Sequence, residues 1–157
     1  MTRAVPDARS LDDLGPLADR LLAELPALFL RQHPTVLIGS LDGGACWRDE
    51  GDIDAVEHEG VEYVPAFQLR DGRPHPTIRA VLAAFPPELT AWDRAYWFVS
   101  SEPGLGGRRP CEALDDVEAL VASARQAGAE IIAKRHQTKR NLDLHAQAGR
   151  LNRASLQ

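Results

Sequence analysis

Residues 10–32 carry apolar side chains at three- and four-residue spacing, the period of one face of an α-helix. This face consists of Leu11, Leu14, Leu17, Leu21, Leu25, Leu28 and Phe29. A single apolar stripe of this kind normally packs against the rest of a domain, so we expect it to be buried. Pro26 lies inside the segment, and because proline donates no backbone hydrogen bond we expect it to bend or divide the helix.

Two short segments after this helix have the composition of β-strands. Residues 35–38 (TVLI) and 61–64 (VEYV) are rich in β-branched and aromatic side chains. Residues 42–59, which separate them, are rich in glycine and acidic side chains and show no clear period. We interpret that stretch as a loop or a weak hairpin.

Helical signals dominate the next part of the chain. Residues 76–85 begin with Pro76, whose missing N–H is harmless at the first helical position. Thr90 and Asp93 have the spacing of a capping box, which predicts a second helix through Val99. That helix is apolar around most of its circumference, which indicates burial on several sides. Its aromatic side chains are therefore expected to be core and not a stacking platform for single-stranded nucleic acid.

A third helix is expected from Asp115 or Asp116 through Ala127, with Gly128 as its stop. Beyond Gly128 the apolar residues are too sparse to form a core. Residues 129–157 are therefore expected to continue or restart as a helix that frays towards the end and uses its basic face in an intermolecular contact.

These elements predict a mainly α fold. Residues 1–62 are expected to form a helix with short strands and no clear helix-turn-helix, residues 63–128 a compact helical domain, and residues 129–157 a basic helical tail. The chain has 157 residues, 44% hydrophobic and 26% charged, which is typical of one globular domain with appendages.

Membrane, export and redox signals do not appear in the sequence. No apolar run approaches the roughly 18 residues of a membrane span, and the start MTRAVPDARS has no apolar signal core. We therefore expect a cytoplasmic protein. Cys46 and Cys111 lie far apart without a C-x-x-C pair, so neither a disulfide framework nor a zinc site is indicated.

The net charge of −5 is unevenly distributed. Residues 129–157 hold six basic and two acidic groups, a net +4, whereas the other 128 residues hold 12 basic and 21 acidic groups, a net −9. A body this acidic is unlike a DNA-binding domain. The acidic run over residues 49–62 has no EF-hand order, so a solvated loop is favoured over a Ca²⁺ or Mg²⁺ site.

The loop from Gly104 to Pro110 has three glycines within four residues, and these are followed inside the loop by two arginines, Arg108 and Arg109. Three interpretations are open for it: a phosphate-binding nest, a tight connector between helices, or a rigid loop presented to a partner. The phosphate interpretation is the weakest because the loop lacks the lysine of a Walker A motif. Paired arginines beside a rigid turn suit contacts with carboxylates or phosphates.

Around this loop, an ordered set of residues resembles the toxin-binding domain of the Xre/MbcA/ParS-like antitoxins, over about sixty residues. The opening of the family pattern is matched by Tyr63, Pro65, Ala66, Phe67 and Gln68, with Val64 inserted. Its turn is matched by Gly72, Arg73, Pro74 and Pro76. Its last part is matched by Trp97, Pro103, Leu105, Gly106, Gly107, Pro110 and Leu114.

The resemblance implies a binding protein of a bacterial type II toxin–antitoxin system. Its partner would be a RES-domain toxin that consumes NAD or ADP-ribosylates proteins, and inhibition would be steric. The partner-binding residues would be Leu105, Gly106, Gly107, Arg108, Arg109 and Pro110, with Trp97 supporting the loop from beneath. It implies no catalytic residue, cofactor or metal; a homodimer is possible.

Two other functions stay open. Many members of this family repress their operon through an N-terminal helix-turn-helix, which residues 1–62 do not indicate, so a DNA role would have to use the basic tail. A transcriptional regulator acting through residues 129–157 is therefore the alternative. An enzyme has no support from local spacing, because no nucleophile–base pair or metal-ligand motif is present in the sequence.

Overall fold

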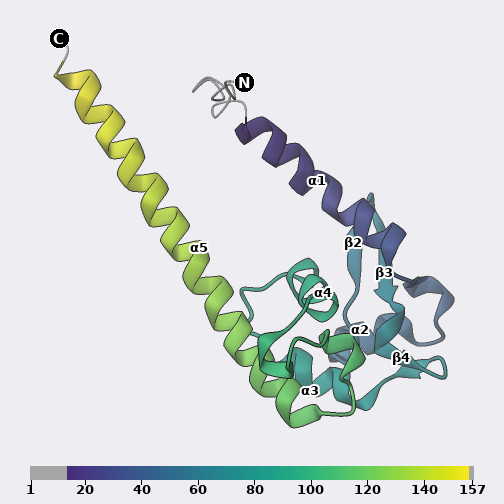
Figure 1. The fold of residues 1–157 in the computed structure, drawn as a ribbon. Helices are drawn as coiled ribbons and strands as arrows, with labels where there is room; N and C mark the ends of the chain where they lie inside the picture. Colours follow the sequence, from purple (N-terminus) through teal and green to yellow (C-terminus); the bar gives the residue numbers. More distant parts are fainter. Residues whose placement is uncertain (1–13, 156–157) are drawn as a thin grey trace, which may run out of the picture.

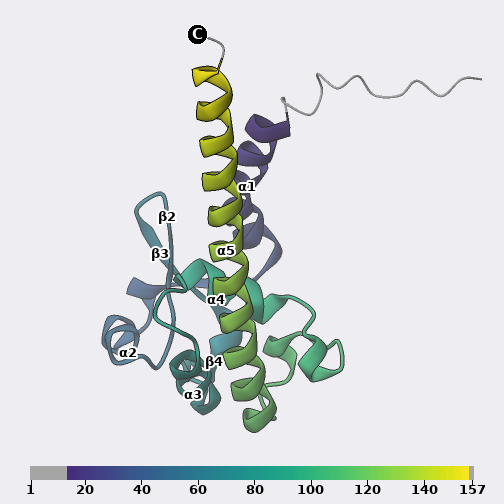
Figure 2. The same ribbon diagram turned by 90° about the vertical axis from the view of Figure 1, so that its left-hand side faces the viewer.

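A computed structural model describes residues 14–155, and helices dominate it as predicted. The helices are α1 (Leu14–Gln32), α2 (Gly44–Glu50), α3 (Pro76–Ala84), α4 (Ala91–Val99) and α5 (Val117–Ala154). The strands are β1 (Thr35–Leu37), β2 (Val56–His58), β3 (Val61–Pro65), β4 (Leu69–Arg70) and β5 (Arg73–Pro74). Figures 1 and 2 show α1 and the distal part of α5 extending from the body on the same side.

The two predicted strands are confirmed and lie in one antiparallel sheet of order β1-β3-β2. Val36 of β1 lies opposite Val64 of β3, and β2 pairs with the other edge of β3. Glu59 and Gly60 form the β2–β3 turn with φ values of 51° and 77°. Successive left-handed residues are typical of a two-residue hairpin turn. Of residues 42–59, which were expected to form a loop or weak hairpin, only 56–59 belong to this hairpin, because its second strand begins at Val61.

The sequence analysis missed α2, which lies inside the same glycine-rich stretch. Gly43 and Gly51 bound it in left-handed conformations, and the Gly51 N–H donates to the carbonyl of Arg48. A helix of only 7 residues has too few turns to show a period. Its glycines, which favoured a loop, instead define both ends of the helix.

Both predicted starts of the central helices are confirmed. At α3, Pro76 occupies the first turn and the ring Nδ1 of His75 accepts a hydrogen bond from the Thr77 N–H at 3.2 Å. At α4, the Thr90 hydroxyl accepts from the Asp93 N–H, and the Asp93 carboxylate accepts from the Thr90 N–H at 2.8 Å. These contacts satisfy N–H groups that the helices themselves cannot.

The core consists of two clusters of buried side chains. The larger lies between α3, α4 and α5, and its buried members are Ile78, Val81, Phe85, Leu89, Trp97, Phe98, Leu105, Ala113, Leu120 and Ala124. The smaller joins the end of α1 to the sheet and α4 through Phe29, Val56 and Ala95. Trp92 and Tyr96 pack on Phe29 in the smaller cluster, as expected for core aromatics.

The stripe predicted to be buried on α1 is instead largely exposed. Leu17 and Leu21 retain 50% and 56% of their surface, whereas Phe29 retains 3%. The prediction was wrong because only the last turns of α1 reach the body, so the rest of the helix has no packing partner among the described residues (Figure 1). Division at Pro26 was also wrong, since α1 is continuous across it. Residues 10–13, which the predicted helix included, lie outside the described residues.

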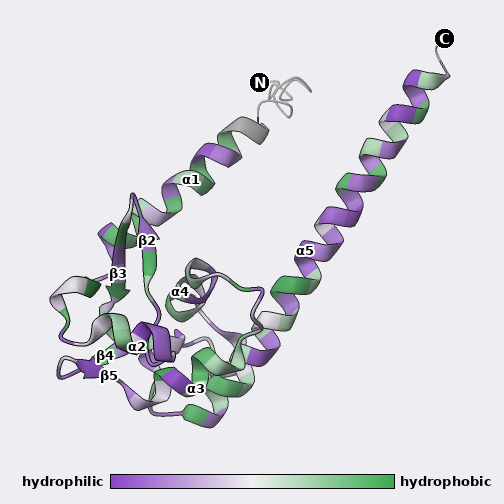
Figure 3. Ribbon diagram, turned by 180° about the vertical axis from the view of Figure 1, so that it is seen from behind, coloured by the Kyte–Doolittle hydropathy of each residue, from purple (hydrophilic) through white to green (hydrophobic). Residues whose placement is uncertain are grey.

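The predicted helix stop at Gly128 is wrong as well, because α5 runs through it for 38 residues. Gly128 is a packing position: a Cβ there would lie 2.4 Å from the Cδ of Pro86. The predicted boundary at residue 128 thus falls inside α5, and the boundary at residue 62 falls inside β3. The part of the tail beyond this contact is mostly hydrophilic (Figure 3).

Replacing Gly128 with alanine is expected to lower the free energy of unfolding by about 1–3 kcal/mol, because the new methyl group overpacks the contact with Pro86. Urea denaturation measures the change. Gly149→Ala in the same helix is the matched control, since its nearest neighbour would be the Arg153 Nη2 at 3.9 Å. The control is expected not to reduce stability. An equal loss in both variants would contradict the packing role.

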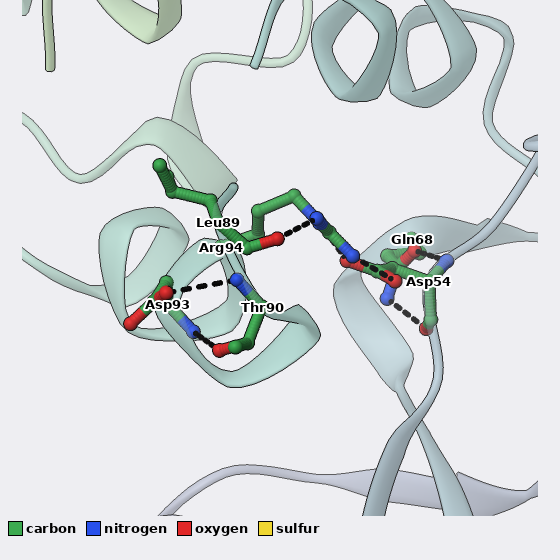
Figure 4. A network of polar contacts seen from close by, with 6 residues as sticks. All are labelled: Asp54, Gln68, Leu89, Thr90, Asp93 and Arg94. Atoms are coloured by element: carbon green, nitrogen blue, oxygen red, sulfur yellow. Dashed lines mark hydrogen bonds and ion pairs between the residues drawn. The ribbon is translucent and has the colours of Figure 1, made fainter. Parts of the chain in front are cut away.

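The acidic run over residues 49–62 is solvated only in part: Asp49, Glu50, Glu57 and Glu59 are exposed, as predicted, but the run includes the end of α2 and all of β2, and its other acids are paired. Asp54 forms a bidentate ion pair with Arg94 of α4, with 2.5 Å and 3.0 Å between the paired atoms (Figure 4). The side-chain amide of Gln68, which is buried, bonds the backbone N–H and carbonyl of Asp54. Asp52 and Glu62 pair with Arg79 and Arg48. These contacts join the run to the helical body.

Candidate functional site

The glycine–arginine loop connects α4 to α5 by way of two 3-10 turns, Pro103–Leu105 and Pro110–Glu112. Its predicted partner-binding residues fall into two groups. Leu105 and Pro110 are buried and anchor the two ends of the loop. The exposed group is Gly106, Gly107, Arg108 and Arg109. The loop therefore presents a short exposed segment between two fixed points.

Trp97 lies beneath the loop, as the sequence analysis expected. Its side chain is 7% exposed and packs edge-on against Phe85 and Phe98, each at a ring-centroid distance of 5.1 Å. The indole Nε1–H donates to the Glu102 Oε2 at 2.9 Å. Trp97 is thus a core residue that positions the first residue of the loop and has little surface of its own to offer a partner.

Glu102 organises the loop from that position. Its second carboxylate oxygen accepts a hydrogen bond from the Gly104 N–H at 3.1 Å. Its backbone carbonyl accepts from the N–H groups of Leu105 and Gly107, each at 3.0 Å. Gly106 and Gly107 adopt φ values of 68° and 85°, which side chains other than glycine rarely adopt. The loop is therefore fixed by its own hydrogen bonds.

The phosphate-nest interpretation does not fit this geometry. The backbone N–H groups of residues 104–108 all donate inside the loop, to Pro103, to Leu105 and to the carboxylate and carbonyl of Glu102. A nest binds an anion only through N–H groups that point outward and lack partners. The loop can therefore contact an anion through its arginine side chains but not through the N–H groups of residues 104–108.

The two arginines have different surroundings. The Arg108 Nε–H donates to the Leu105 carbonyl at 3.2 Å, which holds the side chain against the loop. Arg109 pairs with Glu112 at 2.5 Å on the surface, and this hydrogen bond lowers the pKa of the Glu112 carboxyl. Arg109 is also near His33, whose pKa is lowered chiefly by burial and further by the Arg109 charge. The loop and the end of α1 therefore share one region of the surface.

A notch of about 260 Å³ lies in that region, between α1 and α4. Its lining residues are Leu25, Leu28, Phe29, Gln32, His33, Tyr96 and Val99. The Tyr96 hydroxyl is buried and has no hydrogen-bond partner among the described residues, and burial raises its pKa. The sequence analysis missed this notch, because it had assigned the leucines of α1 to the core.

A larger groove of about 810 Å³ lies between α2, the β4–β5 hairpin and the start of α3. Four of its lining residues belong to the matched turn: Gly72, Arg73, Pro74 and Pro76. Trp47 and the Arg79–Asp52 ion pair line it as well. The fold thus gathers the turn residues around a polar groove that is distinct from the glycine–arginine loop.

The cysteines do not have the properties of catalytic nucleophiles. Burial raises the pKa of Cys111, and a hydrogen bond to Glu50 raises that of Cys46, whereas an activated thiol needs a lowered pKa. Within residues 14–155, no group of three or more histidine, cysteine or acidic side chains could hold a metal ion. In the same residues no helix is long and apolar enough to cross a membrane.

Comparisons with known proteins do not assign this chain to a family. No protein-family model matches the sequence, and no match was found among curated proteins or among solved structures.

Proposed function

We propose that this protein is an antitoxin-like binding module that sterically inhibits a RES-domain toxin and has no catalytic activity of its own. The observation that supports it is the exposed segment Gly106–Arg109, held rigid by Trp97 and Glu102. A loop that is ordered before binding loses little conformational entropy when a partner docks on it. The ordered residues that resemble the Xre/MbcA/ParS-like antitoxins favour a RES-domain toxin as the partner.

The exposed residues have complementary roles in this proposal. Gly106 and Gly107 have no side chain, and the space above them is open except for the Ser101 Oγ 3.7 Å from a Cβ at Gly107. A partner backbone can therefore approach them closely. Arg108 and Arg109 would contact carboxylates of the toxin, since a guanidinium forms paired hydrogen bonds with that group. Docked in this way, the helical body would lie beside the NAD cleft and block entry of the substrate.

Co-expression with a RES-domain toxin encoded beside this chain tests the proposal. We expect the two proteins to co-purify and the chain to restore growth and cellular NAD when the toxin is induced. A toxin that remains fully active, and that does not co-purify with a correctly folded chain, would contradict the proposal.

The second candidate is a DNA-associated regulator acting through the distal part of α5. It is favoured by the exposure of residues 136–155, which extend away from the acidic body (Figures 1 and 2). Arg135, just before this segment, cannot add to its basic surface, because it is paired with Asp93 at 2.6 Å. Truncation after His136 separates the candidates and keeps Ile131 and Ile132, which pack on the core. A chain that inhibits no toxin but binds DNA in a strongly salt-dependent way, and loses that binding on truncation, would favour the regulator.

A further inference from the structure

The exposed stripe of α1 is an apolar surface that no other part of residues 14–155 covers. Its members are Leu17, Leu21, Leu22, Leu25 and Leu28, each between 37% and 63% exposed. Five leucines exposed side by side on one helix form a contiguous patch of the kind that marks an interface. At the C-terminal end of α1 the stripe continues into the notch beside Tyr96 and Val99.

We infer that this stripe is a homodimer interface in which two copies of α1 pack antiparallel about a two-fold axis near Ala23. In that register Leu21 of one copy lies opposite Leu25 of the second copy, and Leu25 lies opposite Leu21. Leu17 of one copy lies within one residue of the level of Leu28 in the second copy, so it lies at the second copy's notch. An interface of this symmetry uses one patch twice.

The charges beside the stripe favour a second copy of this chain as the partner, and an antiparallel orientation of the two helices. At 100° per residue, Arg20 and Glu24 both lie on one flank of the stripe, whereas the opposite flank carries Leu22 and Phe29. In an antiparallel two-fold pair the same flank of each helix faces its equivalent. Arg20 then lies within two residues, or about 3 Å along the axis, of Glu24 in the second copy. The reciprocal pair forms as well.

A parallel pair of helices would match the charges less well and would bury a less continuous apolar contact. It would bring the charged flank of one copy against the leucine flank of the other, so that Arg20 and Glu24 would lose water without gaining an opposite charge. The antiparallel pair instead matches opposite charges and extends the contact towards the notch. The inference does not depend on the proposed function, since it requires no toxin.

Sedimentation velocity of the full chain over a range of concentrations tests the dimer. We expect a concentration-dependent dimer whose Kd rises at least about 30-fold in Leu21→Glu, which would bury a charge at the centre of the interface. Leu144→Glu is the matched control: Leu144 is 63% exposed on α5, and its Kd should stay within about twofold of wild type. Circular dichroism verifies that both variants keep their helix content.

A charge exchange tests the register. Arg20→Glu and Glu24→Arg alone each place like charges opposite each other, and each should raise the dimer Kd by about threefold to tenfold. The double variant restores opposite charges and should return the Kd close to wild type. A chain that stays monomeric at millimolar concentration, a dimer broken by Leu144→Glu but not by Leu21→Glu, or a double variant no better than the single ones would overturn the inference.

Discussion

Replacing Trp97 with alanine is expected to lower the free energy of unfolding by about 3–5 kcal/mol. The ring is buried between Phe85 and Phe98, so its removal leaves a cavity in the larger of the two core clusters. It also removes the donor to Glu102, on whose position the glycine–arginine loop depends. Urea denaturation followed by far-ultraviolet circular dichroism measures the change.

Trp97→Phe separates the two effects of this substitution. Phenylalanine keeps most of the apolar contact but cannot donate to Glu102, so we expect a smaller loss of about 1–2 kcal/mol. Binding to the partner should weaken in this variant if the hydrogen bond orders the loop. An alanine variant that melts at the wild-type temperature would show that the ring contributes little to the core.

Replacing Gly107 with valine is expected to abolish partner binding while the fold survives. The φ of 85° at this position disfavours a β-branched residue, at a cost of about 1–2 kcal/mol. The new side chain would enter open space, since only the Ser101 Oγ lies within 4 Å of its Cβ. It would therefore displace a partner and not the core. A pull-down of the toxin, with circular dichroism as the folding test, measures both.

Gly60→Val is the matched control for backbone strain. Gly60 has a φ of 77°, an open surround, and a place in the β2–β3 turn, away from the loop. It should show a similar loss of stability with binding unchanged. Unfolding of the Gly107 variant alone would show that the loop has a structural role, and retained binding would remove Gly107 from the interface.

Signals that act over a few residues were predictable from the sequence. The Thr90–Asp93 capping box and the proline in the first turn of α3 concern contacts within one helical turn, so neighbouring residues suffice to specify them. Strands β1 and β3 followed from their strand-forming composition, although their pairing with each other was not predicted. The support of the loop by Trp97 was expected from the resemblance, and the structure places the ring directly beneath Glu102.

The outcomes that the sequence left undetermined depend on what lies across the fold. A glycine such as Gly128 is typical of a helix end. In the structure it lies inside α5, where its lack of a side chain allows close contact with the ring of Pro86. The leucines of α1 have the period of a buried stripe, but burial requires a facing surface, which the part of the chain that the structure describes supplies only near Phe29. Nothing in the sequence distinguishes Asp54 from the neighbouring acids; its contacts with Arg94 and Gln68 appear only in the fold.

The sequence by itself determined that the fold is mainly α and where β1, β3, α3, α4 and α5 begin. Capping, turn chemistry and glycine conformation depend on adjacent residues, so they are encoded locally. Only the tertiary structure decided which apolar faces are covered, which acids are paired and whether the N–H groups of the loop are available to a ligand. The first two depend on distances between residues far apart in the chain, and periodicity carries no information about such distances. The third depends on hydrogen bonds within residues 102–108, which follow from the backbone conformation of the loop.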